Sequence, residues 1–165
     1  MIPFATYVDA AGASLRSSNS VSLQSRIDAA NVDPPDGIQL PAIADDRILP
    51  GGADPIGPPY PVVELALPEF EITGFDLGQR GGDVTTSVAL RVWLLDVSYD
   101  RLWRILYRFS DCVIECLVQP GAFGQGVTVG GVRGQFGFNP ETQEKQAVLA
   151  SSVIVFNLDD TAARP

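Results

Sequence analysis

The sequence predicts an α+β domain of two layers, in which one long helix packs across a mainly antiparallel sheet. A short N-terminal helix and an extended Pro/Gly-rich arm are expected to precede this core. Three observations predict the fold: one long apolar stripe at helical spacing, alternating segments on both sides of it, and eight of thirteen prolines within the first 60 residues. We therefore expect an arm with a short helix at 1–60, a core domain at 61–158 and a flexible tail at 159–165.

The N-terminal part contains one short helical pattern, Ser20–Asn31, which Ser20 or Ser22 caps and Pro34 and Pro35 end. The stretch Asp33–Tyr60 has little periodicity and predicts an extended segment. A structureless loop of this length is unusual inside a compact domain, so we expect the segment to become ordered against a neighbouring subunit. A plain surface loop is the alternative.

Strand patterns begin after residue 60. Val62–Leu67 and Glu69–Thr73 lie on either side of Pro68, and the large residues change from odd to even positions there. A slip of one residue is typical of a β-bulge, where proline is tolerated. Beyond a glycine-rich turn at Gly74–Gly82, Val84–Val97 alternates apolar and polar residues and predicts an amphipathic strand.

The long helix is predicted at Ser98–Val118, with Ser98 as its N-cap and Pro120 and Gly121 beyond its end. Cys112 and Cys116 belong to its apolar stripe. Two cysteines four residues apart on one helical face are poorly placed for a disulfide, so we expect two buried free thiols and a reducing compartment.

The C-terminal part is rich in glycine. Gly121–Gly126 lacks the spacing of a phosphate-binding loop, and we interpret it as a turn that requires positive φ. Weak strands are predicted around Val127–Val132 and Gln135–Phe138. The final strand, Gln146–Leu158, is apolar on both faces, so it should be central or covered on both sides.

Composition excludes several functions. The formal net charge of −9 disfavours general binding of nucleic acid, and the complete lack of histidine removes Ser-His-Asp and Cys-His sites. With only two cysteines, the usual zinc ligand sets are also absent. The aromatic residues of Arg133–Phe138, which resemble half of an RNA-recognition signature, are better interpreted as core or interface residues. We expect no enzyme, no catalytic residue, no cofactor and no metal site, and neither a signal peptide nor a membrane span.

Candidate contacts with a partner come from charge and loop position. Arg101, Arg104 and Arg108 recur at three- and four-residue steps on the long helix. They form either a solvated face with local ion pairs or a basic ridge that docks on an acidic neighbour, and the sequence favours neither. Further candidates are Gln79 and Arg80 in the glycine-rich turn, Phe123, and Arg47.

The order of these segments resembles the tail terminator (tail completion) proteins of long-tailed bacteriophages. The resemblance lies in Arg47-Ile48-Leu49-Pro50, the Gly51–Pro58 segment, the strand start Pro59–Glu64, and the junction of the Val84–Val97 strand with the Ser98–Val118 helix. It covers roughly residues 20–158 as an order of elements, and residues 1–19 depart from it.

The resemblance implies a structural, non-enzymatic virion protein, assembled in the host cytoplasm and located in the tail or neck. Such proteins form a hexameric ring that caps the tail tube and joins it to the head-completion (stopper) protein. DNA passes through the lumen without specific binding, and no membrane is involved. The alternatives are another neck, connector, tail-tube or baseplate component, or a non-viral intracellular binding or adaptor domain.

Overall fold

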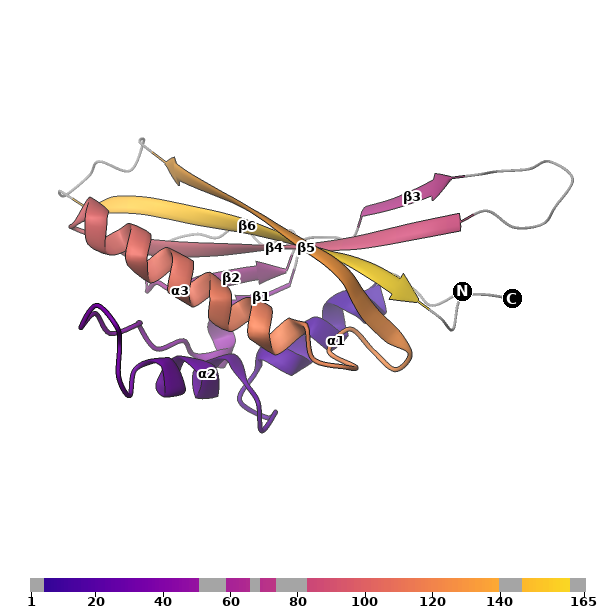
Figure 1. The fold of residues 1–165 in the computed structure, drawn as a ribbon, viewed down its shortest axis with the longest axis horizontal. Helices are drawn as coiled ribbons and strands as arrows, with labels where there is room; N and C mark the ends of the chain where they lie inside the picture. Colours follow the sequence, from indigo (N-terminus) through magenta and orange to yellow (C-terminus); the bar gives the residue numbers. More distant parts are fainter. Residues whose placement is uncertain (1–4, 51–58, 66–68, 74–82, 140–146, 161–165) are drawn as a thin grey trace, which may run out of the picture.

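The computed structural model describes residues 5–50, 59–65, 69–73, 83–139 and 147–160. A twisted sheet forms one layer, and three helices lie together on one of its faces (Figure 1). The helices are α1 (Ala5–Leu15), α2 (Leu23–Ala30) and α3 (Tyr99–Leu117), with a 3-10 turn, η1, at Asp45–Arg47. The strands are β1 (Ile48–Leu49), β2 (Val62–Leu65), β3 (Glu69–Thr73), β4 (Asp83–Asp96), β5 (Val127–Asn139) and β6 (Val148–Asp160).

The sheet has the order β1-β2-β4-β6-β5, and β3 pairs with the same edge of β4 as β2 does. All pairings are antiparallel except that of β1 with β2. The predicted α+β class is therefore confirmed, with a long helix across a mostly antiparallel sheet. Strand β6 lies between β4 and β5, inside the sheet, as the apolar residues on both of its faces predicted.

The predicted slip near Pro68 is present in the register. Leu65 pairs with Leu90, and Glu69 pairs with Ser87. The chain therefore advances four residues from β2 to β3 while β4 advances three. The edge of β4 is thus shared by two short strands that are one residue out of phase, so that the odd positions of β2 and the even positions of β3 have the same parity relative to β4.

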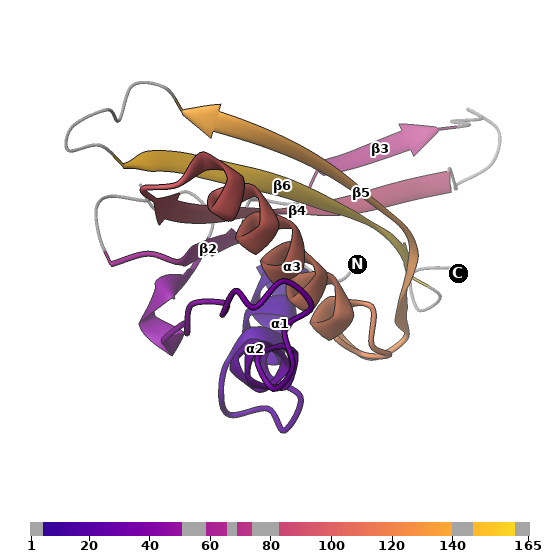
Figure 2. The ribbon, with the colours of Figure 1, turned by 60° about the vertical axis from the view of Figure 1, so that its left-hand side comes forward.

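Helix α3 supplies the centre of the core. Ser98 caps it by accepting a hydrogen bond from the Arg101 amide at 3.4 Å, as predicted. Its stripe packs on the face of the sheet formed by the even-numbered residues of β4 and β6, and Figure 2 shows the helix running diagonally across these strands. The buried stripe consists of Leu102, Ile105, Leu106, Phe109, Ser110, Cys112, Val113, Cys116 and Leu117. Ser110, its polar member, bonds to Leu106 O at 2.7 Å and to the Ser152 hydroxyl of β6 at 2.8 Å.

Helix α1 was not expected from the sequence. It buries Tyr7, Val8, Ala11 and Leu15 in the same core, and its side of the core includes small residues. A Cβ added at Gly12 would lie only 2.9 Å from Leu65 Cδ1, so glycine allows α1 to approach β2 closely.

The first part of the predicted arm also packs against its own domain. Leu40, Ile43 and Ile48 are buried core residues, and the Arg16 guanidinium donates to Ile48 O at 3.1 Å. Residues 5–50 therefore contribute to one core with the sheet. Helix α2 begins after Ser22, which accepts a hydrogen bond from the Ser25 amide, so Ser22 is the cap of the two that were considered.

The C-terminal part differs in two details from the expectation. The two weak strands are one continuous strand, β5, with an irregularity in register between Val129 and Gly131. Strand β6 extends to Asp160, into the expected tail, and residues 161–165 lie outside the described part. The Gly121–Gly126 turn has positive φ at Gly121, Gly124 and Gly126, as predicted. None of the described helices is both long and apolar enough to cross a membrane.

Candidate interaction surfaces

In the described part of the chain, no three His, Cys, Asp or Glu side chains are grouped as ligands for a metal ion. Cys112 borders a shallow pocket of about 220 Å³ next to Arg26 and Glu115, but the thiol itself is buried.

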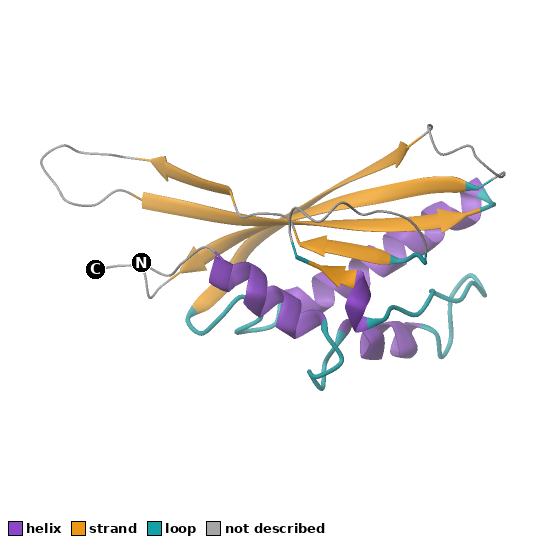
Figure 3. Cartoon of the chain, turned by 180° about the vertical axis from the view of Figure 1, so that it is seen from behind, coloured by secondary structure: helices purple, strands orange, loops and turns teal. Residues whose placement is uncertain are grey.

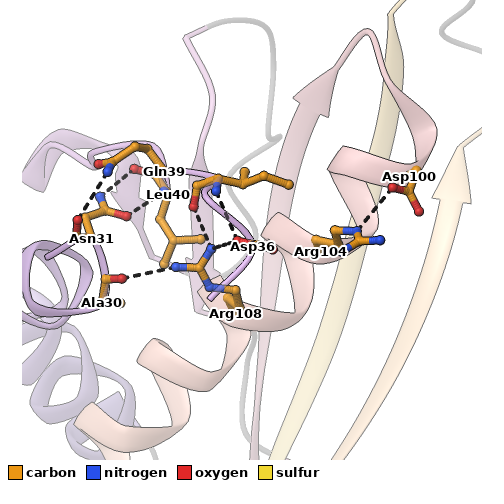
Figure 4. Close-up of polar contacts among 9 residues, drawn as sticks. Ala30, Asn31, Asp36, Gln39, Leu40, Asp100, Arg104 and Arg108 are labelled. Carbon is orange, nitrogen blue, oxygen red and sulfur yellow. Dashed lines mark hydrogen bonds and ion pairs between the residues drawn. The ribbon is translucent and has the colours of Figure 1, made fainter. Parts of the chain in front are cut away.

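The three arginines of α3 do not form one ridge. Arg104 is exposed and pairs with Asp100 one turn earlier at 3.1 Å, and Arg101 is exposed and pairs with Asp96 at 3.3 Å. Arg108 instead points toward α2 and the segment that comes after it (Figure 4). Only 17% of its side chain is exposed. Arg101 and Arg104 thus fit both interpretations made from the sequence, whereas Arg108 acts within the fold.

Arg108 holds the start of the predicted arm. It donates to Asp36 Oδ1 at 2.8 Å, to Ile38 O at 2.6 Å and to Ala30 O at 3.1 Å. Asn31 reinforces the same segment by accepting from the Leu40 amide at 2.7 Å and donating to Leu40 O at 2.9 Å (Figure 4). The segment up to residue 50 therefore packs on its own domain through these contacts.

The remaining candidates from the sequence have different positions. Phe123 is a core residue, 2% exposed, with its ring centroid 5.4 Å from that of Phe156, so it is not available to a partner. Arg47 is half-buried at the end of η1. Gln79 and Arg80 lie outside the described residues, as does the 51–58 segment of the arm.

Cys112 and Cys116 are buried and unpaired, as the sequence predicted. Burial raises the pKa of the Cys112 thiol to about 11, with the nearby carboxylates of Glu115 and Asp111 acting in the same direction. Burial also raises the pKa of the Cys116 thiol to about 11, and Arg26 opposes part of this effect. Both thiols are therefore neutral at physiological pH, which suits a structural role and not a nucleophilic one.

A row of aromatic side chains on α3 was not identified from the sequence. Tyr99, Trp103 and Tyr107 recur every four residues, with ring centroids 6.2 Å and 5.5 Å apart along the row. Phe136 of β5 joins it, 4.3 Å from Tyr107 and 5.9 Å from Trp103. Tyr99 is 55% exposed and Tyr107 is 51% exposed. The sequence does contain the spacing of four residues between these aromatic residues. The aromatic residues lie beside the wider apolar stripe of the same helix, which made that stripe the dominant pattern.

The aromatic row continues onto β5. Val132 of β5 lies on the same face of the sheet as the helices and is 38% exposed. Together Tyr99, Trp103, Tyr107, Val132 and Phe136 form what we call the aromatic patch. Exposed apolar side chains of this kind, rich in Tyr and Trp, are typical of protein interfaces.

The opposite face of the sheet forms a second surface. No described helix covers it, and Figure 3 shows the three helices together on the other side. The face carries half-buried Val153 and Val155 from β6, and exposed Leu95 at the end of β4. We call this the open face.

Polar groups on the open face are incompletely paired. Arg91 lies 5.4 Å from the centroid of the Trp93 ring and 3.9 Å from the Glu64 carboxylate. Glu64 Oε2 and Trp93 Nε1 are buried, and neither has a hydrogen-bond partner. Buried polar groups in native proteins are normally satisfied, so these two atoms mark a region where a further polar contact would stabilise the protein.

Comparison of the chain with models of known protein families gave no match, and comparison with curated proteins gave none either.

Proposed function

We propose that this chain is a structural subunit of a bacteriophage particle, which assembles with copies of itself into a ring and acts as a tail terminator. The single observation that carries the proposal is the aromatic patch. Trp103 and Phe136 of the patch pack against the core, whereas about half of the Tyr99 and Tyr107 side chains is exposed. Tyr and Trp are the side chains that most often dominate the energy of a protein interface.

The fold supports the same role. The order of a helix, an extended segment, a strand start, a long strand, a long helix and two closing strands agrees with the resemblance over residues 20–158. The helices lie on one face of the sheet, and the aromatic patch lies on that side, where Phe136 of β5 meets Tyr107 of α3. A subunit that joins its copies into a ring needs apolar surface beside each contact, and the patch is such a surface.

Charge supports the rest of the proposal. A chain with a net charge of −9 does not retain DNA by attraction to phosphate, which suits a ring through which the duplex must pass. In the ring, exposed Arg101 and Arg104 would contribute local positive charge at contacts between acidic copies. The tail-tube protein and the head-completion protein are the expected partners at the two ends of the ring.

Native mass spectrometry and negative-stain electron microscopy of the purified protein test the proposal. We expect a concentration-dependent hexamer with a central opening, which binds the ends of tubes polymerised from the tail-tube protein of the same virus. A protein that remains monomeric at about 100 µM and leaves tube ends uncapped would refute it. A ring that binds elsewhere in the particle would support the alternative of another neck or baseplate component.

A matched pair of variants tests the aromatic patch. Tyr107→Glu places a charge in the patch, and Val32→Glu places one at an 85% exposed position outside it. Val32→Glu should leave the melting temperature nearly unchanged, whereas Tyr107→Glu should lower it by a few degrees, because the Tyr107 ring loses its contacts with Trp103 and Phe136. Only Tyr107→Glu should weaken association, and equal assembly of the two variants would remove the patch from the interface.

A further inference from the structure

We propose that the subunits of this ring are joined through their sheets, with strand β5 of one copy pairing antiparallel with strand β3 of the next. This inference rests on the proposed function, which requires a homo-oligomer, and it names the joint that forms it. Its occupant is a second copy of this chain.

Both strands have an edge to which no described strand is bonded. In the described part of the chain, β5 pairs only with β6, and β3 pairs only with β4. Strand β5 has thirteen residues, so it presents a long row of backbone donors and acceptors. Edges of this kind pair readily with a strand from another chain unless they are blocked.

The position of β3 makes it accessible. Together with the first half of β4, it projects beyond the helical layer, away from the body of the domain (Figure 1). Strand β1, at the same side of the sheet, pairs with β2 and not with β3. A neighbouring copy can therefore reach the outer edge of β3 without displacing a described element.

Strand direction also favours this joint. Strand β4 is antiparallel to both β3 and β6, and β5 is antiparallel to β6. It follows that β3 and β5 run in opposite directions at the two edges of one sheet. When copies are placed side by side with their sheets continuous, β5 of one meets β3 of the next in the antiparallel sense. Such a contact joins two different surfaces, and contacts of this type can close into rings.

The two edges carry opposite charges. Arg133 is exposed on β5, and its pairing with Val155 places it on the open face of the sheet. Register also places positions 69 and 71 on the open face, since they pair with Ser87 and Thr85 of β4, and both positions are glutamate. By register, the two glutamate positions of β3 thus fall on the same face of the sheet as position 133 of β5, which is arginine.

Pairing of the two edges requires only a small shift of one copy along the strands relative to the next. Arg133 lies level with Ala89 of β4 through Val155, and Glu69 lies level with Ser87. A displacement of two residues between neighbouring copies, about 7 Å along the strands, brings Arg133 opposite Glu69. The same register brings Gly131 opposite Glu71. An even displacement keeps every residue on its own face, so the open faces of successive copies join into one surface.

Disulfide trapping tests the joint, because the native cysteines are buried. Arg133→Cys and Glu69→Cys, each made in the full chain, should remain unlinked when they are oxidised separately. Mixed together they should form a linked dimer, and the double variant should form a ladder that ends at the size of the ring. Gly131→Cys with Glu71→Cys is a second pair in the same register, and an added Cβ at Gly131 meets nothing closer than 3.6 Å. Arg101→Cys with Glu69→Cys is the control and should not link.

Each result has a definite meaning. A linked dimer from Arg133→Cys alone would indicate a two-fold contact between β5 strands and would overturn the proposal. A ring in native mass spectrometry with no link in either pair would overturn the joint and leave the proposed function standing. A wild-type chain that never associates would remove both.

Charge reversal gives a separate measurement. Arg133→Glu should raise the dissociation constant about tenfold or more, because like charges would then face each other across the joint. Adding Glu69→Arg to this variant should restore association. If the double variant is as weak as Arg133→Glu while both melt like the wild type, the pairing of these two positions is wrong.

Discussion

Replacing Arg108 with alanine tests whether this arginine holds the segment after α2 in place. The change removes three hydrogen bonds, one of them to the Asp36 carboxylate, whose side chain is only 14% exposed. Hydrogen bonds that involve a charged group contribute about 1.5–3 kcal/mol each, and breaking a buried ion pair costs about 3–5 kcal/mol. Because 17% of the Arg108 side chain remains in contact with water, we expect a loss of about 2–4 kcal/mol. For a chain of this size, this lowers the melting temperature by about 5–15 °C.

Urea unfolding followed by the fluorescence of Trp93 and Trp103 measures this loss. Arg104→Ala is the matched control, since its exposed pair with Asp100 contributes about 0.3–0.5 kcal/mol. Hydrogen exchange should also show faster exchange in residues 31–43 of Arg108→Ala before global unfolding. If both variants lose the same small amount of stability and residues 31–43 remain protected, the contacts of Arg108 do not order this segment.

Three further predictions concern the core. Phe123→Ala should lower the free energy of unfolding by about 3–5 kcal/mol, as expected for a fully buried aromatic side chain. A loss below about 1 kcal/mol would indicate that Phe123 is not buried in the core. Ser110→Ala removes two buried hydrogen bonds, to Leu106 O and to the Ser152 hydroxyl, and leaves the buried Ser152 hydroxyl without this partner. It should cost about 1–3 kcal/mol, more than Ser152→Ala, which removes one of the two bonds, costs in the same unfolding assay. Because the pKa values of Cys112 and Cys116 are raised to about 11, thiolate is scarce at pH 7–9, and quantitative alkylation should find two thiols only after denaturation. Rapid labelling of the native protein would contradict their burial.

The parts of the fold that were predicted are those in which a repeat of large apolar residues leaves one interpretation. The stripe of α3 recurs every three or four residues, and β4 alternates without interruption from Val88 to Leu94. The β-bulge at Pro68 could also be predicted, because the large residues change there from odd to even positions. In a strand, this change is compatible with one buried face only if an extra residue is inserted.

The missed parts lack such a repeat. The buried side of helix α1 includes the small residues Ala11 and Gly12, so it differs little in hydrophobicity from the exposed side. The segment from 33 to 50 is fixed by single apolar anchors, Leu40, Ile43 and Ile48, which are too widely spaced to suggest a periodic element. Arg108 looked like a surface charge because its partners are mostly backbone carbonyls, and a sequence does not show where carbonyl groups lie.

The place of β6 in the sheet has a consequence for the order in which the protein can fold during synthesis. It is the last described strand to leave the ribosome, yet it lies between β4 and β5 and pairs with both along most of its length. Until it emerges, β4 and β5 have no common partner, and the apolar stripe of α3 has only part of its sheet to pack on. Strands β5 and β6 follow one another in the sequence, whereas β6 and β4 pair across segments that are 52 residues or more apart, and such pairings are slow to form. We expect the nascent chain to gain most of its stability in one late step, when β6 pairs with β4 and brings β5 into the sheet.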